Sequence, residues 1–277
     1  MDVELEADEQ YILLLLSDSN LPTGSFVASA GLESYGKHGF LSLSNSAADG
    51  TTTFVRESLA TYARSALPFV SDAHSIVQSS PLAEPIDLTA ATQKLSALDE
   101  LYETTTLNHV AKRASAAQGV ALLTLYSKGF SKTSPSRTFT RADKLKSLID
   151  KFKMMVRREE TRGHLPVCWG VLTGALGLSL ERAQYLHLFL HARGLLSSAV
   201  RLNTMGPYSA QQHILHTVKP WIEEEIINCR DLRTGLSNTE EADSVQEGPN
   251  IGPATTWPLG EILAARHDLQ HSRIFNS

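Results

Sequence analysis

LKSLIDKFKMMV, residues 145–156, is the stretch that decides the fold class. Its apolar residues recur every three or four positions, which is the spacing of one face of an α-helix: Leu145, Leu148, Ile149, Phe152 and Val156. The same period appears in residues 54–62 and 186–196. No stretch shows a sustained apolar and polar alternation rich in β-branched residues, which a strand would need. We therefore predict an all-α fold, a helical bundle of about ten helices.

Capping residues indicate where several helices begin. Asp87 precedes a helical pattern from Leu88 onward, and Ser179 precedes another that opens with Leu180. Both side chains can accept hydrogen bonds from the free N–H groups of a first helical turn. Pro207 suits a first helical position, because the N–H that proline lacks would be unpaired there. These signals predict helices that start near residues 88, 180 and 207.

Two polar stretches predict the domain organisation. Residues 127–140 are rich in Ser, Thr and Lys, and residues 234–258 combine Gly, Pro and acidic residues with few apolar ones. Such a composition buries too little apolar surface to offset the entropy lost on ordering. We predict a single helical domain over residues 1–233, a flexible linker over 234–258, and a C-terminal segment, 259–277, that belongs to the same functional unit.

Composition excludes several classes of protein. The chain has 277 residues and a net charge of −5, and it lacks the long Lys/Arg tract that would indicate binding to nucleic acid. Its N-terminus is acidic, and the apolar run Ile12–Leu16 is too short for a signal peptide or a membrane span. Cys168 and Cys229 lie far apart and form no CxxC pair, which favours a reducing compartment. We expect a cytoplasmic protein that binds neither nucleic acid nor membrane.

One stretch resembles a nucleotide-binding loop. Gly31 to Lys37 fits the pattern GxxxxGK, but His38 follows where a P-loop needs a Ser or Thr hydroxyl for Mg²⁺. The preceding residues do not form the pattern of a buried strand. The same letters suit a helix that ends at Gly36, and we favour this interpretation.

The histidines and cysteines also indicate no catalytic site. His187 and His191 share one helical face, but the pair lacks the glutamate of HExxH. We interpret them as ordinary helix-surface or partly buried residues. The apolar surroundings of Cys168 would raise its thiol pKa, which favours a packing role. We therefore expect no enzyme, no catalytic residue, no metal ligand and no cofactor.

Packing surfaces are the more informative feature. Residues 21–36 begin with a Pro/Gly turn and continue into small residues that allow another helix to approach closely. Arg201 lies among apolar residues and needs a buried partner, for which Glu33 is one candidate. Near the end of the chain Arg273 is flanked by apolar residues, which indicates that something receives this segment.

These stretches together resemble the UreF family of urease accessory proteins. The family's early PxGxFxxSxGLE motif is filled by Pro22, Gly24, Phe26, Ser29, Gly31, Leu32 and Glu33. Its middle RxSxxxG element is matched by Arg113, Ser115 and Gly119, and its late element by Ser198, Ala199, Val200, Arg201, Leu202, Gly206, Gln211 and Leu215. Its terminal SRLFxS appears as Ser272, Arg273, Ile274, Phe275 and Ser277. Ser198 and Ile274 depart mildly, and the two polar stretches are longer than in bacterial members, as in eukaryotic ones.

The resemblance implies an all-α homodimer without catalytic residues of its own. It implies a complex with a UreD/UreH-type accessory protein that recruits a UreG-type GTPase and apo-urease and delivers nickel. We expect the C-terminal segment, with Arg273 and Phe275, to dock on the UreD-type partner and to become ordered on binding. The region Pro22–Glu33 would shape the face for dimerisation and GTPase recruitment. The alternatives are a helical adaptor outside urease maturation and a helical metal-dependent hydrolase that uses His187 and His191.

Overall fold

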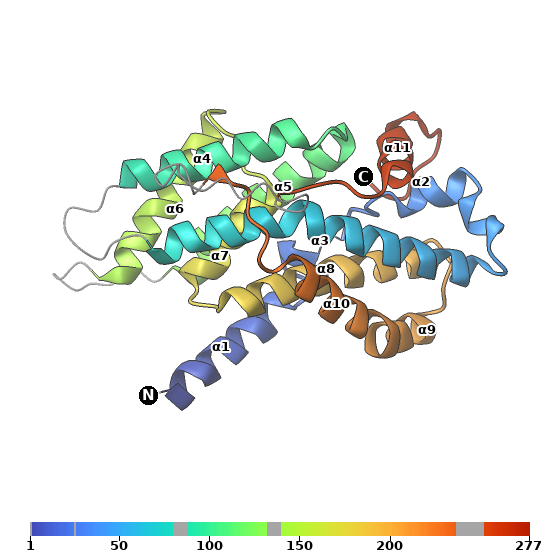
Figure 1. The fold of residues 1–277 in the computed structure, drawn as a ribbon, viewed down its shortest axis with the longest axis horizontal. Helices are drawn as coiled ribbons and strands as arrows, with labels where there is room; N and C mark the ends of the chain where they lie inside the picture. Colours follow the sequence, from blue (N-terminus) through green and yellow to red (C-terminus); the bar gives the residue numbers. More distant parts are fainter. Residues whose placement is uncertain (1, 25, 80–87, 132–139, 237–251) are drawn as a thin grey trace.

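The computed structural model describes residues 2–24, 26–79, 88–131, 140–236 and 252–277, and the regular elements in these ranges are all helices (Figure 1). This confirms the all-α prediction. The central helix is α3 (Ala47–Ser79), against which pack α4 (Leu88–Thr105), α7 (Leu165–Ala175), α8 (Leu180–Arg201) and α10 (Lys219–Cys229). Further α-helices are α1 (Asp2–Leu16), α2 (Leu32–Lys37), α5 (His109–Leu125), α6 (Arg141–Arg157), α9 (Pro207–Gln212) and α11 (Pro258–Ala265). Among the described helices, none is long and apolar enough to cross a bilayer.

Short 3₁₀- and π-helices complete the described chain. The 3₁₀-helices are η1 (Pro22–Gly24), η2 (Phe40–Leu43) and η6 (Arg266–Leu269). The π-helices are η3 (Tyr126–Phe130), which extends α5 into the first predicted loop, and η4 (His213–Val218), which joins α9 to α10. Residues 132–139 of that loop and 237–251 of the predicted linker lie outside the described residues.

The apolar residues form two clusters that share α3 and α8. The first core packs the C-terminal half of α3, including Phe69, against α4, α5, α6 and α7. The second core packs the N-terminal half of α3, including Phe54, against α2, α8 and α10. α8 contributes Leu186 to the first cluster and Leu195 to the second. The apolar residues that recur every three or four positions in the sequence thus lie on the buried faces of the helices.

Close approach of α7 to α3 depends on two glycines. A Cβ atom at Gly170 would lie 2.5 Å from the carbonyl oxygen of Val70, and one at Gly174 would lie 3.1 Å from the Cβ of Val77. Real Cβ atoms do not approach backbone at the first of these distances. Glycine is therefore required at Gly170 if the two helix backbones are to pack at this separation.

The capping analysis agrees with the helix boundaries. Ser179 occupies the N-cap position of α8, and Pro207 lies in the first turn of α9, as predicted. The Ser179 hydroxyl does not cap the helix, however, and donates instead to the Glu9 carboxylate at 2.9 Å. α4 begins at Leu88, but Asp87 lies outside the described residues. Thr140 and Asp143 form a capping box on α6 that the sequence analysis did not identify.

A buried carboxylate ties α4 to the loop before α7. Asp99 is fully buried, and its oxygens accept hydrogen bonds from the N–H groups of Arg162, Gly163 and His164 at 2.6–2.8 Å. The hydroxyl of Thr161 donates a fourth, at 2.5 Å. These bonds satisfy main-chain donors of the loop before α7, including that of the N-cap residue His164, which burial would otherwise leave unpaired. Asp99 thereby fixes the position of α7, which carries the two glycines.

The C-terminal segment is packed on the helical body. α11 and η6 lie beside α2, and Leu263 and Phe275 are 5% and 2% exposed. The sequence analysis expected a segment that becomes ordered only on binding; here residues 252–277 have a defined path within the same chain (Figure 1). The reason is a set of polar partners on α2 that the sequence pattern did not pair with this segment.

We expect Asp99→Ala to lower the free energy of unfolding by about 3 kcal/mol, because it leaves buried N–H donors without an acceptor. Urea unfolding followed by circular dichroism measures this change. Glu100→Ala, at an exposed neighbouring position on the same helix, is the control and should change stability by less than about 0.5 kcal/mol. Equal stabilities for the two variants would contradict the role given to Asp99.

Candidate interaction surface

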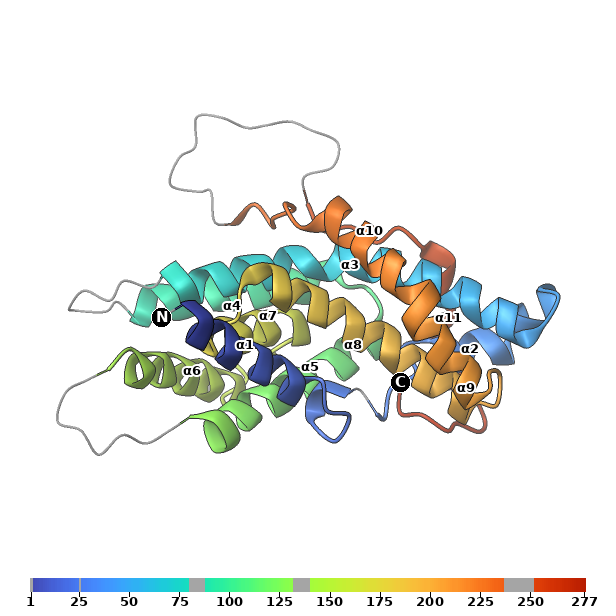
Figure 2. The same cartoon turned by 90° about the horizontal axis from the view of Figure 1, so that it is seen from below.

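The four sequence motifs converge on the end of the chain. Residues 272–277, which we call the tail, run beside α2, and both views place the C-terminus near that helix (Figure 1 and Figure 2). The tail receives contacts from the early motif, from Arg113 of the middle motif and from Arg201 of the late motif. Motifs separated by up to about 250 residues in sequence thus form one site.

Glu33 is the main anchor of the tail. Its side chain is 1% exposed, and its two carboxylate oxygens accept the N–H groups of Ile274 at 2.8 Å and Phe275 at 3.1 Å. Lys37, one turn later on α2, lies 3.4 Å from the same carboxylate and donates to the carbonyl oxygen of Ser272. A buried carboxylate needs such donors, and here the tail backbone provides two of them.

Main-chain contacts continue this pairing to the end of the tail. The N–H of Ser29 donates to the main-chain oxygen of Ser277 at 2.6 Å, and the Ser29 hydroxyl donates to the same atom at 3.0 Å. The N–H of Asn276 donates to the carbonyl oxygen of Val27 at 2.9 Å. The tail is therefore held by its backbone, so most of its binding does not depend on its side chains.

Gly31 allows the C-terminal segment to lie against α2. It has a φ of 90°, and a Cβ atom there would lie 2.8 Å from the Cβ of Ala264 in α11. Both the left-handed backbone and the close contact favour glycine. Ser34 adds a hydrogen bond of 2.5 Å to the carbonyl oxygen of Leu263. Gly31 and Ser34 thus position the C-terminal segment and contribute no reactive group.

Arg201 lies between two aromatic rings. Its guanidinium carbon is 4.3 Å from the ring centre of Phe26 and 4.2 Å from that of Phe275. Removal from water lowers the pKa of Arg201, and its Nε is buried without a hydrogen-bond partner. Glu33, suggested by the sequence as its partner, is instead bonded to the tail backbone. The cation–π contacts make Arg201 a clamp on the Phe275 side chain.

Arg113 and Arg273 share one carboxylate, that of Asp268. Arg113 makes two bonds to it, at 2.8 and 2.9 Å, Arg273 makes one at 2.8 Å, and His109 lies 3.4 Å away. The Arg113 hydrogen bond, together with the charges of Arg113, Arg273 and His109, holds the pKa of Asp268 well below its usual range. Asp268 could not be identified from the sequence, because a single Asp within a short 3₁₀-helix forms no recognisable pattern.

The remaining motif residues lie elsewhere or have internal roles. Ser115 accepts the N–H of Leu165 at 2.9 Å, and a Cβ at Gly119 would collide with the carbonyl oxygen of Gly163, so both position the start of α7. Leu32 is fully buried in the second core. Pro22 and Gly24 are the first and last residues of η1, and Gln211 is exposed on α9. The letters of GxxxxGK form α2, as the helical interpretation predicted, but the helix does not end at Gly36: it continues to Lys37, and the glycine with a left-handed backbone after it is Gly39.

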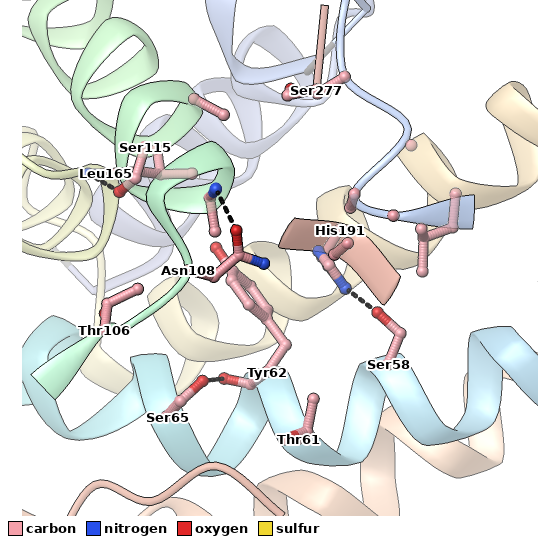
Figure 3. A pocket seen from close by; sticks show the side chains of 18 of the residues that line it. Ser58, Thr61, Tyr62, Ser65, Thr106, Asn108, Ser115, Leu165, His191 and Ser277 are labelled. Carbon is pink, nitrogen blue, oxygen red and sulfur yellow. Dashed lines mark hydrogen bonds between the residues drawn. The ribbon is translucent and has the colours of Figure 1, made fainter. Parts of the chain in front are cut away.

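His187 and His191 face a cavity of about 190 Å³ beneath the C-terminal segment (Figure 3). The Nε2 of His187 bonds the Tyr62 hydroxyl at 2.9 Å, and the Nε2 of His191 bonds the Ser58 hydroxyl at 3.0 Å. The Tyr62 ring also stacks on His191, with ring centres 4.0 Å apart. Within the described part of the chain, no group of three or more His, Cys, Asp or Glu is placed to hold a metal ion.

Burial keeps this histidine pair neutral. Desolvation, with a smaller effect of His191, lowers the pKa of His187 to about 3, and desolvation lowers that of His191 to about 4. Burial also raises the pKa of the Cys168 thiol well above its ordinary value, as the sequence predicted. The pair therefore resembles a polar network within a core, in agreement with the interpretation as partly buried residues.

Comparisons with known proteins identify the nearest family. Residues 46–218 match the sequence model of the UreF family. The chain is 43% identical over 313 residues to urease accessory protein 6 of Cryptococcus neoformans var. grubii, covering 98% of each. It is 30% identical over 269 residues to a UreF-like urease accessory protein of Schizosaccharomyces pombe, covering 97% of each. It is 28% identical over 264 residues to urease accessory protein F of Arabidopsis thaliana, covering 95% of this chain and 90% of that one.

We expect Glu33→Ala to release the tail while leaving the cores folded, because two tail N–H groups lose their acceptor. Hydrogen exchange at Ile274 and Phe275 should become at least about tenfold faster, whereas exchange within α3 should not change. Glu57→Ala, at an exposed position on α3, is the control. Unchanged exchange at the tail would contradict the anchoring role of Glu33.

The histidine pair predicts a pH-dependent stability. Because the pKa values of about 3 and about 4 lie below the ordinary value of 6.5, the unfolded chain binds more protons as pH falls. Stability should be complete above about pH 6.5 and decline toward pH 4, by about 1 kcal/mol per pH unit for each histidine. Urea unfolding between these values should give a shallower slope for the double variant His187→Gln, His191→Gln. Burial also lowers the pKa of His74, so the wild type and the double variant should both keep the pH dependence of stability that His74 contributes.

Proposed function

This chain belongs to the UreF family of urease accessory proteins, and we propose that it acts as the adaptor of a nickel-delivery complex. In that complex it binds a UreD/UreH-type accessory protein, recruits or regulates a UreG-type GTPase, and assists nickel transfer to apo-urease. Nickel is the cargo, and the transfer takes place in the cytoplasm. The observation that carries the proposal is the gathering of separate family motifs around one exposed segment, the tail.

The exposed part of this site is suited to a protein partner. Phe26, Val27 and Ile274 are 65%, 55% and 64% exposed, and Arg113 and Arg273 flank them. We call these five residues the tail surface. An interface core of exposed apolar side chains beside arginine is typical of protein–protein recognition. The tail surface is the docking site that we assign to the UreD/UreH-type partner.

The early motif contributes to the same surface. Phe26 and Val27 adjoin the tail, since Val27 accepts the Asn276 N–H and Phe26 stacks on Arg201. We propose that the exposed part of Pro22–Glu33 outside the tail surface, which includes Pro22 and Ala30, serves homodimerisation and GTPase recruitment. Leu32, Ser29 and Glu33 are buried and act by shaping this face from within.

The proposal predicts a partner-binding defect from a single surface change. Ile274→Ser should weaken binding to the co-expressed UreD/UreH-type protein by about tenfold, because it removes an exposed apolar anchor while the backbone bonds of the tail remain. Ile227→Ser on α10, at a position 69% exposed, is the matched control. Titration calorimetry measures both affinities, and equal binding by the two variants would exclude the tail surface as the docking site.

A second prediction concerns the urease of the native host. Without this gene, urease protein should accumulate at its normal level but contain little nickel and show little activity. Restoring the gene should restore both, as measured by activity and by elemental analysis of purified urease. Fully nickel-loaded urease in the absence of the gene would contradict the proposed role and would favour an adaptor outside urease maturation.

A further inference from the structure

Cationic side chains gather around α2 and the tail in excess of carboxylates. They are Lys37, Arg113, Arg201, Arg266 and Arg273, and the carboxylates that pair with them are Glu33 and Asp268. The ion pairs of the described residues include none to Arg201 or Arg266. The exposed Arg266 donates from Nε to Nε2 of His38 at 3.1 Å. This part of the surface is therefore positive, although the whole chain has a net charge of −5.

A groove lies within this positive region. It has a volume of about 450 Å³ and runs between the tail and α2. Leu41, Leu202 and Ile274 line it, with Lys37 and Arg273 as its cations. The carboxylate of Glu33 also borders the groove, but both of its oxygens accept tail N–H groups and one of them lies beside Lys37.

We infer that this groove binds an acidic segment of a partner protein, one that places a carboxylate side chain next to an apolar one. The apolar side chain packs on Leu202 and Ile274, and the carboxylate faces Lys37 and Arg273. Arg266 lies outside the groove, beside His38 at the end of α2, and adds to the positive charge around it. Charge complementarity supports this occupant, because the exposed cations around α2 and the tail, Lys37, Arg113, Arg266 and Arg273, outnumber the two carboxylates that pair with them, Glu33 and Asp268. The inference rests on the proposed adaptor function and adds the chemistry of the partner surface.

The apolar lining favours protein over nucleic acid as the partner. A nucleic-acid backbone requires a row of cations that follows successive phosphates. Here the cations surround a short groove with leucine and isoleucine side chains. An acidic segment with apolar residues satisfies both parts of the groove.

The inference can be tested by measuring association kinetics with the co-expressed UreD/UreH-type protein. The residue to change is Arg266, which in the described structure makes no hydrogen bond or ion pair with the tail and donates to His38. Arg266→Glu should lower the association rate constant on the order of tenfold at low salt, and raising salt from about 50 mM to about 300 mM should reduce the difference. Arg230→Glu is the control, because Arg230 is similarly exposed at the end of α10 and pairs only with the exposed Asp231. Equal rates for the two variants at every salt concentration would overturn the inference.

Carbodiimide cross-linking supplies a second measurement. This reagent joins an amine to a carboxylate in contact with it, and Lys37 is the amine of the groove. Cross-linked peptides should join Lys37 to an Asp or Glu of the partner, and Arg266→Lys should add a second link to the same acidic segment. Arg230→Lys should add none. Links only between two copies of this chain, or none to the partner, would overturn the inference.

The outcomes separate this inference from the proposed function. One outcome is a stable complex whose association rate does not change with salt or with Arg266→Glu and in which Lys37 forms no cross-link to the partner. It would refute binding of an acidic segment in the groove and leave the adaptor function standing. Absence of any complex with the wild-type chain would refute the adaptor function, and the inference with it. Tight, Arg266-dependent binding of a single-stranded RNA in place of the protein would also overturn the inference.

Discussion

A buried carboxylate that accepts N–H groups from the far end of the chain organises the candidate site. Glu33 would be costly to bury alone, and the tail backbone supplies two donors to it. Once these bonds form, Phe275 lies against Arg201 and Arg273 lies beside Asp268. The exposed residues Ile274, Phe26 and Val27 then share one surface. The remaining geometry of the site follows from this one pairing.

Much of the fold could be predicted from local sequence. The period of Leu145, Leu148, Ile149 and Phe152 identifies a helix, and Ser179 marks the N-cap position of another, because both signals depend on neighbours a few residues away. The protein family could likewise be identified from motif letters in order. The packing of α7 on α3 could not be predicted in this way. From sequence alone Gly170 only weakens a helix, and its role becomes clear once a Cβ atom there is seen to collide with the carbonyl oxygen of Val70.

The site was only partly predictable because its contacts are long-range. The sequence marked Glu33, Arg201 and Arg273 as important but offered Glu33 as the partner of Arg201, since charge is the only complementarity that a sequence displays. In the structure Arg201 is held by aromatic faces and Glu33 by main-chain N–H groups, neither of which leaves a charge pattern. Asp268 was missed for a similar reason: its importance comes from Arg113 and Arg273, which converge on it from different segments.

The sharing of α3 between the two cores has a consequence for cooperativity. Phe54 and Phe69 belong to different clusters but to one helix, which continues through Pro68, and α8 spans the same boundary with Leu186 and Leu195. Melting either cluster alone would require two helices to break in the middle, where each broken end exposes unpaired N–H and C=O groups. The two clusters should therefore unfold together as one unit. The tail, which is held by bonds to α2 and to Val27 and Ser29, can open separately as a smaller unit.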